Sequence, residues 1–178
     1  MWVFGYGSLM IDGWEDGYGC TQRVVAELRG YQRVFDKASI VNWGTRACPC
    51  PTLNLRPCSK LDGCVGTAFE FPDERRVDVE AYLVKREGKG FELKSLEVTA
   101  TGAGVVQALV PIYTGKNVLI ATSRDDLLKL IQQASGKSGN CTTYVLNVYD
   151  ELAKAGIQDA AVTSLRNFLV KFAREHGQ

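Results

Sequence analysis

The order of apolar and polar positions divides the chain into a first part rich in strands and a last third rich in helices. Short runs of β-branched and aromatic residues, bounded by glycine, asparagine or proline, are typical of strands. Besides the first residues from Trp2 onward, such runs occupy residues 23–28, 32–35, 64–71, 91–99 and 105–113. A glycine-containing stretch, 100–104, separates the last two runs, so we expect a hairpin there.

A helix is predicted directly after the run that ends at residue 71. Pro72 fits the first turn of a helix, and the acids Asp73 and Glu74 suit the positive end of its dipole. Gly88 can adopt the left-handed conformation that ends a helix after Glu87. The positions spaced i, i+4 and i+7, which predict the buried face of this helix, are Val77, Ala81 and Val84, with Tyr82 beside them.

Three further helices are predicted in the last third. Ser123 and Asp126 are typical of a capping box, and they precede an apolar stripe at Leu127, Leu130, Ile131 and Ala134. The helical pattern continues over 141–155 and 159–175, the latter with an apolar face at Leu165, Phe168, Leu169 and Phe172. Strands followed by helices indicate the α+β class. We expect a single domain over residues 1–178.

Residues 42–62 contain several prolines and glycines between the predicted strands. The segment is predicted to be a long irregular loop, and loops of this length are often functional lids or binding loops.

Charge and hydropathy exclude several classes of partner. The formal net charge is +1, and basic and acidic residues are interleaved, which argues against a nucleic-acid footprint or a polybasic membrane patch. No apolar run reaches the length of a membrane span, and the first residues do not have the pattern of a secretory signal. We therefore expect a cytoplasmic protein with a small-molecule partner.

The six cysteines stand at positions 20, 48, 50, 58, 64 and 141. In a cytoplasmic protein they are expected to be reduced thiols, and replacement of Cys48 and Cys50 by serine is expected to matter little. The spacing of the four central cysteines does not match that of zinc knuckles, so no metal and no cofactor are expected.

The only histidine, His176, lies close to the C-terminal end of the sequence. A Ser-His-Asp or Cys-His arrangement therefore has no suitable base. Proton transfer in this protein must run through a carboxylate, a tyrosine, a lysine or water.

Two segments carry candidate chemistry. In the first, the predicted strand from Trp2 runs into Gly5-Tyr6-Gly7-Ser8-Leu9, where glycines would let several backbone N–H groups converge on a carboxylate or phosphate. Gly7 is expected to hold a dihedral that only glycine tolerates. The alternative is a tight strand-end turn that packs Tyr6. No third glycine follows at the dinucleotide-binding spacing.

The second segment contains Glu87 at the predicted end of a helix. The negative end of the helix dipole disfavours the charged form of a carboxyl group there, whereas an acid placed for solubility belongs at the other end. The alternative is a solvated glutamate paired with Lys85 or Arg86.

Taken together, three ordered blocks resemble the γ-glutamylcyclotransferases, and most closely their ChaC-type branch, which acts on glutathione. The blocks are Trp2–Leu9, Tyr82–Phe91 and Gly136–Tyr144. The resemblance implies a small, mostly closed mixed β-barrel with C-terminal helices packed around it. It also implies that Tyr6, Gly7, Ser8 and Leu9 cradle the γ-glutamyl group and that Glu87 is the catalytic acid and base. The residues implied to line the same pocket are Tyr113 and Tyr144.

The implied reaction needs neither histidine nor metal. The α-amine of a γ-glutamyl amide can attack its own γ-carbonyl, and an intramolecular attack has a large effective molarity. Glu87 would take a proton from the α-ammonium and return it to the departing nitrogen. The turn would hold either the α-carboxylate or the developing oxyanion. The products are 5-oxoproline and a free amine.

The middle of the chain departs from the ChaC-type pattern, because the usual histidine-containing loop is replaced by Asn42–Arg46 and Pro51–Leu55. The second of these resembles other members of the cyclotransferase superfamily, including those that act on γ-glutamylamines. The substrate is therefore either glutathione, which we favour, or a γ-glutamylamine or γ-glutamyl-amino acid. A non-catalytic γ-glutamyl-binding module is the third possibility.

Overall fold

A computed structural model describes residues 1–59, 61–119 and 123–176. The chain divides into two compact units, which we describe separately. The first contains Met1–Arg33 and Leu55–Lys116, and the second contains Val34–Asn54 and Asn117–Gln178.

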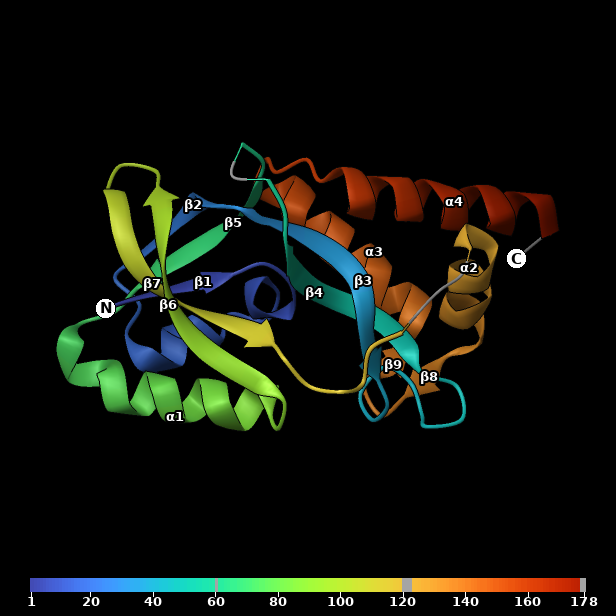
Figure 1. Cartoon of the computed structure of the whole chain (residues 1–178), viewed down its shortest axis with the longest axis horizontal. Coiled ribbons are helices and arrows are strands. Elements are labelled where there is room, and N and C mark those ends of the chain that lie inside the picture. Colours follow the sequence, from blue (N-terminus) through green and yellow to red (C-terminus); the bar gives the residue numbers. More distant parts are fainter. Residues whose placement is uncertain (60, 120–122, 177–178) are drawn as a thin grey trace. The chain divides into compact units, whose positions relative to one another are not determined.

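The first unit is built on a closed five-stranded barrel with the order β1-β5-β2-β6-β7 (Figure 1). Its strands are β1 (Trp2–Gly5), β2 (Gln22–Arg29), β5 (Gly63–Glu70), β6 (Phe91–Ala100) and β7 (Gly104–Tyr113). The parallel pairing of β1 with β7 closes the barrel, and the other pairs are antiparallel. The mixed barrel and the α+β class agree with the sequence prediction.

The strand directions determine which connections meet. In the β6–β7 hairpin, Ala100 pairs with Gly104 at the turn and Phe91 pairs with Tyr113 at the open end. Because β1 runs parallel to β7 and β6 runs antiparallel to it, the end of β1, the start of β6 and the end of β7 lie at one end of the barrel. The turn after Gly5 and the segment before Phe91 therefore meet there.

The helix α1 (Arg76–Glu87) follows a short 3₁₀ turn, η3 (Asp73–Arg75), and ends at Gly88 as predicted. Its predicted buried face is wrong. Val77 and Val84 are 77% and 62% exposed, whereas Val79 and Leu83 are fully buried. Valines occur on both sides of this helix, so spacing alone did not identify the face that packs. The core cluster containing this i, i+4 pair also includes Val3, Leu9, Trp14, Phe69 and Phe71.

The second unit contains three helices, α2 (Arg124–Gln133), α3 (Cys141–Lys154) and α4 (Ala160–His176), and a small hairpin of β8 (Ser135–Gly136) and β9 (Gly139–Asn140). The predicted cap of α2 is confirmed, because the Ser123 side chain accepts a hydrogen bond from the Asp126 N–H at 3.1 Å. Asn140 caps α3 in the same way, through the N–H of Thr143 at 2.7 Å.

The prediction of an irregular loop over 42–62 is wrong in its second half. Strand β4 (Cys50–Pro57) occupies it and pairs with β3 (Tyr31–Ser39), and both strands extend from one unit into the other. Residues Cys50 to Leu55 are all buried. Pro51 and Pro57 hid this strand because proline is typical of turns, but near the two ends of a strand it costs few ladder hydrogen bonds.

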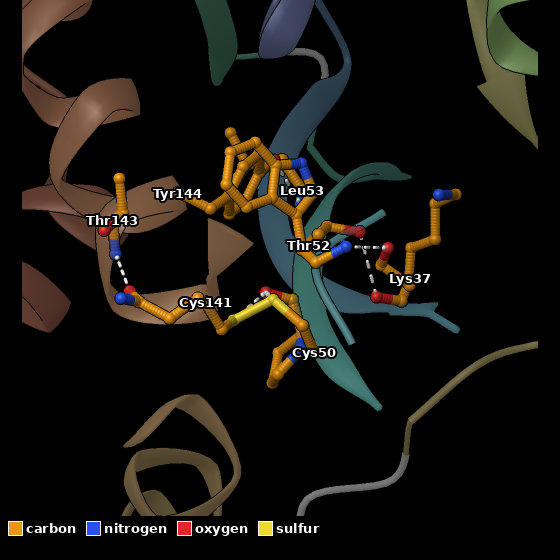
Figure 2. The surroundings of a disulfide bond; sticks show 11 residues. Lys37, Cys50, Thr52, Leu53, Cys141, Thr143 and Tyr144 are labelled. Atoms are coloured by element: carbon orange, nitrogen blue, oxygen red, sulfur yellow. Dashed lines mark hydrogen bonds between the residues drawn. A yellow bond between two sulfur atoms is a disulfide. The ribbon is translucent and has the colours of Figure 1, made fainter. Parts of the chain in front are cut away.

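The expectation that all six cysteines are thiols is wrong for two of them. Cys50 in β4 and Cys141 at the start of α3 form a disulfide with a Cα–Cα distance of 5.6 Å (Figure 2). All six cysteines lie in the described residues, and Cys20, Cys48, Cys58 and Cys64 are outside any disulfide. Cysteines 91 positions apart could not be paired from the sequence, because only the fold brings them together.

Among the helices of the described residues, none combines the length and the apolar character needed to cross a membrane.

The disulfide predicts different effects for two nearby cysteines. Cys50→Ser should lower the free energy of unfolding by roughly 2–4 kcal/mol, because the open chain regains the entropy that a long cross-linked loop loses. Cys48→Ser, at a half-buried thiol, should change it by less than about 0.5 kcal/mol. Denaturant titration measures both.

Thiol titration of the denatured, unreduced protein should find four reactive thiols, and six after reduction. Six thiols before reduction, in protein kept oxidised throughout, would contradict the pairing.

Candidate active site

The turn after β1 has every carbonyl oxygen from Tyr6 to Met10 engaged in a hydrogen bond. Within the turn, the N–H of Met10 donates to the oxygen of Gly7 at 2.9 Å, which forms the short 3₁₀ helix η1 (Ser8–Met10). Side chains engage the other carbonyls. The donors are Arg33 to Tyr6, Arg86 to Ser8, Trp14 to Leu9 and Arg23 to Met10, at 2.7, 2.7, 2.9 and 2.8 Å.

Arg33 holds the beginning of the turn. It lies on β3 and is only 4% exposed. Its Nε donates to the Tyr6 carbonyl, and its Nη2 donates to the Val65 carbonyl at 2.6 Å. The Tyr6 hydroxyl donates to the Pro111 carbonyl at 2.9 Å. The Tyr6 side chain therefore attaches the turn to β7. This agrees with the alternative in which Tyr6 packs at the end of the strand.

The backbone of Gly7 has φ −151° and ψ −124°, which is neither helical nor left-handed. That only glycine tolerates this conformation stays a prediction. Leu9 is 4% exposed and belongs to the core cluster. Any contact of Leu9 with a ligand would therefore involve its backbone.

Arg86 joins helix α1 to the turn. Its Nη2 donates to the Ser8 carbonyl, and its Nη1 donates to Asp12 Oδ2 and to the Tyr82 hydroxyl, each at 2.7 Å. Burial acts to lower the pKa of Arg86, but the hydrogen bonds that it donates to Tyr82 and Asp12, together with the charge of Asp12, outweigh burial and raise the pKa above its usual value. The guanidinium is therefore a fixed cation at every physiological pH.

Aromatic stacking supplies a second connection between α1 and the turn. The rings of Tyr82 and Trp14 are stacked, with centroids 5.1 Å apart and planes 13° apart. Trp14 begins the 3₁₀ helix η2 (Trp14–Tyr18), and its Nε1 donates to the Leu9 carbonyl. Arg86 of α1 thus bonds the Ser8 carbonyl directly, and Tyr82 of α1 stacks on the indole that bonds the next carbonyl, that of Leu9.

Glu87 is the last residue of α1 and is half-buried. Two glycines with positive φ follow it, Gly88 at +73° and Gly90 at +97°. These values let the chain leave the helix and enter β6 within three residues. Since Arg86 is bonded to Ser8, the backbone that carries Glu87 lies beside the turn.

Tyr113 is the last residue of β7, and it packs against the start of β6, which follows Glu87. It is 7% exposed and packs edge-on against Phe91 with centroids 5.1 Å apart. The Gly90 carbonyl accepts the N–H of Thr114 at 2.8 Å and that of Gly115 at 3.1 Å. A Cβ on Gly115 would lie 2.6 Å from the Tyr113 hydroxyl, so glycine leaves room for this ring. Glu87, Tyr113 and the Tyr6–Leu9 turn thus gather at one end of the barrel.

Tyr144 lies in the second unit, on α3. It is 4% exposed, and its hydroxyl accepts the N–H of Leu53 at 3.0 Å, close to the disulfide (Figure 2). The Trp43 ring packs on it with centroids 5.3 Å apart. Gly139 leaves room for Trp43, since a Cβ there would lie 3.3 Å from the indole ring. A role for Tyr144 in substrate binding stays a prediction.

In the part of the chain that the structure describes, no three or more His, Cys, Asp or Glu side chains are grouped so that they could hold a metal ion. The side chain of His176 lies outside the described residues.

Four residues that the sequence did not assign to this site belong to it: Asp12, Arg33, Tyr82 and Arg86. A signal existed for Arg86, because it stands directly before Glu87. No local signal could show that its partners would be Ser8 and Asp12, more than 70 positions away.

The comparisons with known proteins agree with this architecture. Residues 1–172 match the family described as ChaC-like protein. Gamma-glutamylcyclotransferase 2-3 of Arabidopsis thaliana is 31% identical over 94% of this chain and 87% of its own length. The glutathione-specific gamma-glutamylcyclotransferase of Escherichia coli (strain K12) is 28% identical over 99% of this chain and 75% of its own length.

Solved structures show the same fold. A glutathione-specific γ-glutamylcyclotransferase from yeast superposes with a TM-score of 0.84 at 23% identity, over 97% of this chain and 96% of its own. With a family match that spans nearly the whole sequence, a curated relative above 30% identity and a common fold, the chain belongs to the ChaC-like family of γ-glutamylcyclotransferases.

Proposed function

We propose that this protein is a γ-glutamylcyclotransferase that converts glutathione to 5-oxoproline and Cys-Gly. The proposal rests on one observation. The helix end that carries Glu87 lies beside a turn in which the carbonyl oxygens of Tyr6 to Met10 all accept hydrogen bonds from the protein. Curated relatives over most of the chain are named for this activity, and several of them for glutathione.

The reaction begins with binding of the γ-glutamyl group. Each trans peptide directs its N–H opposite to its C=O. With the carbonyls of Tyr6 and Ser8 bound to arginines, the N–H groups of Gly7 and Leu9 are directed away from those cations. They are suited to bind the α-carboxylate, or the γ-carbonyl oxygen as it gains charge.

Ring closure follows. Glu87 takes a proton from the α-ammonium, and the free amine attacks the γ-carbonyl carbon to form the C–N bond of a five-membered ring. The tetrahedral intermediate collapses when the C–N bond to the cysteinyl nitrogen breaks. Glu87 returns its proton to that nitrogen and, as a carboxylate again, takes the second proton from the ring nitrogen. That proton passes to the released amine, so 5-oxoproline forms as a neutral lactam, Cys-Gly leaves as an ammonium, and no external nucleophile or cofactor is consumed.

A cytoplasmic location is part of the proposal. Four of the six cysteines are outside any disulfide, which suits a compartment that keeps thiols reduced. The single disulfide does not form the dense framework that small secreted domains use.

The substrate assignment is tested by a panel of glutathione, γ-glutamyl-amino acids and γ-glutamyl-lysine. Release of 5-oxoproline, measured by mass spectrometry, should be fastest with glutathione and matched by an equal amount of Cys-Gly. Preference for γ-glutamyl-lysine would transfer the assignment to the γ-glutamylamines. No 5-oxoproline from any of them would favour a non-catalytic binding module.

Glu87→Gln keeps the shape of the side chain but cannot shuttle a proton. Turnover should fall by roughly 10²–10⁴-fold with the fold intact. Glu80→Gln is the matched control on the same helix, because its half-exposed carboxylate accepts a 3.4 Å hydrogen bond from Arg76; its rate should stay within about twofold of wild type. Near wild-type turnover by folded Glu87→Gln protein would remove Glu87 from the mechanism.

The segment 42–57 is proposed to select the leaving group. Exposed Arg46 could pair with the glycyl carboxylate of glutathione in a charge-assisted hydrogen bond, a contact that a γ-glutamylamine does not offer. Arg46→Ala, and truncation of Trp43, should therefore lower kcat/KM for glutathione by about tenfold relative to a γ-glutamylamine whose leaving group has no carboxylate. Arg174→Ala, an exposed arginine of α4, serves as the control. Equal losses for both substrates would make Arg46 structural.

A further inference from the structure

We infer that Arg86 is a positioning residue for the reaction, which fixes the substrate-binding turn against the helix end that carries Glu87. The inference rests on the proposed function, and it concerns how the turn and the carboxylate are kept at one distance. Arg86 itself would not touch the reacting atoms.

One side chain and one hydrogen bond connect the turn to the helix end that carries Glu87. Arg86 is the residue immediately before Glu87, and its Nη2 lies 2.7 Å from the Ser8 carbonyl oxygen. A single side chain therefore links the backbone of the proposed acid and base to the peptide that joins Ser8 to Leu9. These two peptides are 78 positions apart in the sequence, so this contact depends on the folded barrel.

The guanidinium is itself held in place. Its Nη1 donates to Asp12 Oδ2 and to the Tyr82 hydroxyl, so both terminal nitrogens of its planar fork are engaged. The Arg86 side chain is only 17% exposed, whereas Asp12 is 53% exposed. A lysine has a compact ammonium on a flexible stem and could not match the fork geometry.

The contact also acts on the donor that faces the substrate. Because the peptide is planar, a cation that fixes the Ser8 carbonyl also fixes the direction of the Leu9 N–H. A charged donor on the carbonyl polarises the peptide and strengthens its N–H as a donor. Arg33 stands in the same relation to the Tyr6 carbonyl and the Gly7 N–H. Arg86 differs because it is attached to the helix end that bears Glu87.

The reaction makes such a link important. Intramolecular ring closure needs little chemistry from the protein beyond holding the reacting groups in line, and a misplacement of about 1 Å can cost roughly 10²-fold in rate. Loss of the Arg86 contact would let the turn and α1 move independently, with both still folded.

The test compares Arg86→Met and Arg86→Lys with the control Arg75→Met. Arg75 directly precedes α1, its side chain is 56% exposed, and its ion pair with Asp78 is long, at 3.8 Å. Steady-state 5-oxoproline release is measured well below the melting temperature of each variant. We expect Arg86→Met to lower kcat by roughly 10–100-fold, Arg86→Lys to lie between it and wild type, and Arg75→Met to stay within twofold.

A double-mutant cycle with Glu87→Gln separates positioning from general stability. If Arg86 acts through Glu87, Arg86→Met should change the residual rate of the Glu87→Gln protein by less than about threefold. The same fold-loss in both backgrounds would overturn the inference, as would a kcat of Arg86→Met within threefold of wild type. A wild-type protein that releases no 5-oxoproline from any substrate would instead overturn the proposed function.

A measurement that does not depend on turnover tests the contact when a variant folds poorly. In ¹⁵N NMR spectra, Arg86→Met should shift the amide resonances of Leu9 and Gly88, and Arg75→Met should not. If Arg86→Met does not fold, Tyr82→Phe and Asp12→Ala each remove one partner of the guanidinium. At least one of them should lower kcat by severalfold with KM changed less than twofold, and wild-type kcat in both would overturn the inference.

Discussion

The geometry of the site depends on one constraint, the direction of the carbonyl oxygens in the turn after β1. A buried carbonyl must find a donor, and leaving one without a partner costs about 1–3 kcal/mol. Here Arg33, Arg86 and Arg23 and the indole of Trp14 supply donors from four different elements. The turn cannot flip a peptide without breaking one of these bonds, so its N–H groups are fixed before a substrate arrives.

The barrel explains why these donors can converge. The parallel pairing of β1 with β7 brings the end of β1 to the end of β7. The antiparallel hairpin brings the start of β6 to the same place, directly after Glu87. One topological feature thus gathers the turn after β1, Glu87 and Tyr113, although they are distant in the sequence.

This arrangement suits a substrate that carries its own nucleophile. The protein does not need to activate a serine, a thiol or a metal-bound water for the attack. It needs to hold the γ-glutamyl chain folded and to move two protons in turn from the attacking nitrogen to the leaving nitrogen. The energetic task is therefore positioning, which matches a site built from rigid hydrogen bonds to the backbone.

The sequence predicted those parts of the protein whose signals are local. Gly88 marked the end of α1, Ser123 marked the start of α2, and the order of strands and helices gave the α+β class. The wrong predictions concern packing and pairing. Which valines of α1 face the core, and whether Cys50 meets Cys141, depend on contacts between distant segments. The prolines of β4 gave a local signal that the pairing with β3 overrides. Arg86 could be noticed beside Glu87, but its partners Ser8 and Asp12 could not be foreseen.

The central claim is that the turn and Glu87 bind the same γ-glutamyl group, the turn through a carboxylate or carbonyl oxygen and Glu87 through the α-amine. A crystal structure of the Glu87→Gln protein with glutathione bound tests this most directly, because the variant should retain the unreacted substrate. We expect a substrate carboxylate or carbonyl oxygen at about 3 Å from the N–H groups of Gly7 or Leu9, and the α-amine within hydrogen-bonding distance of the side chain at position 87. A γ-glutamyl group bound away from the turn, with position 87 out of reach of the amine, would contradict the account.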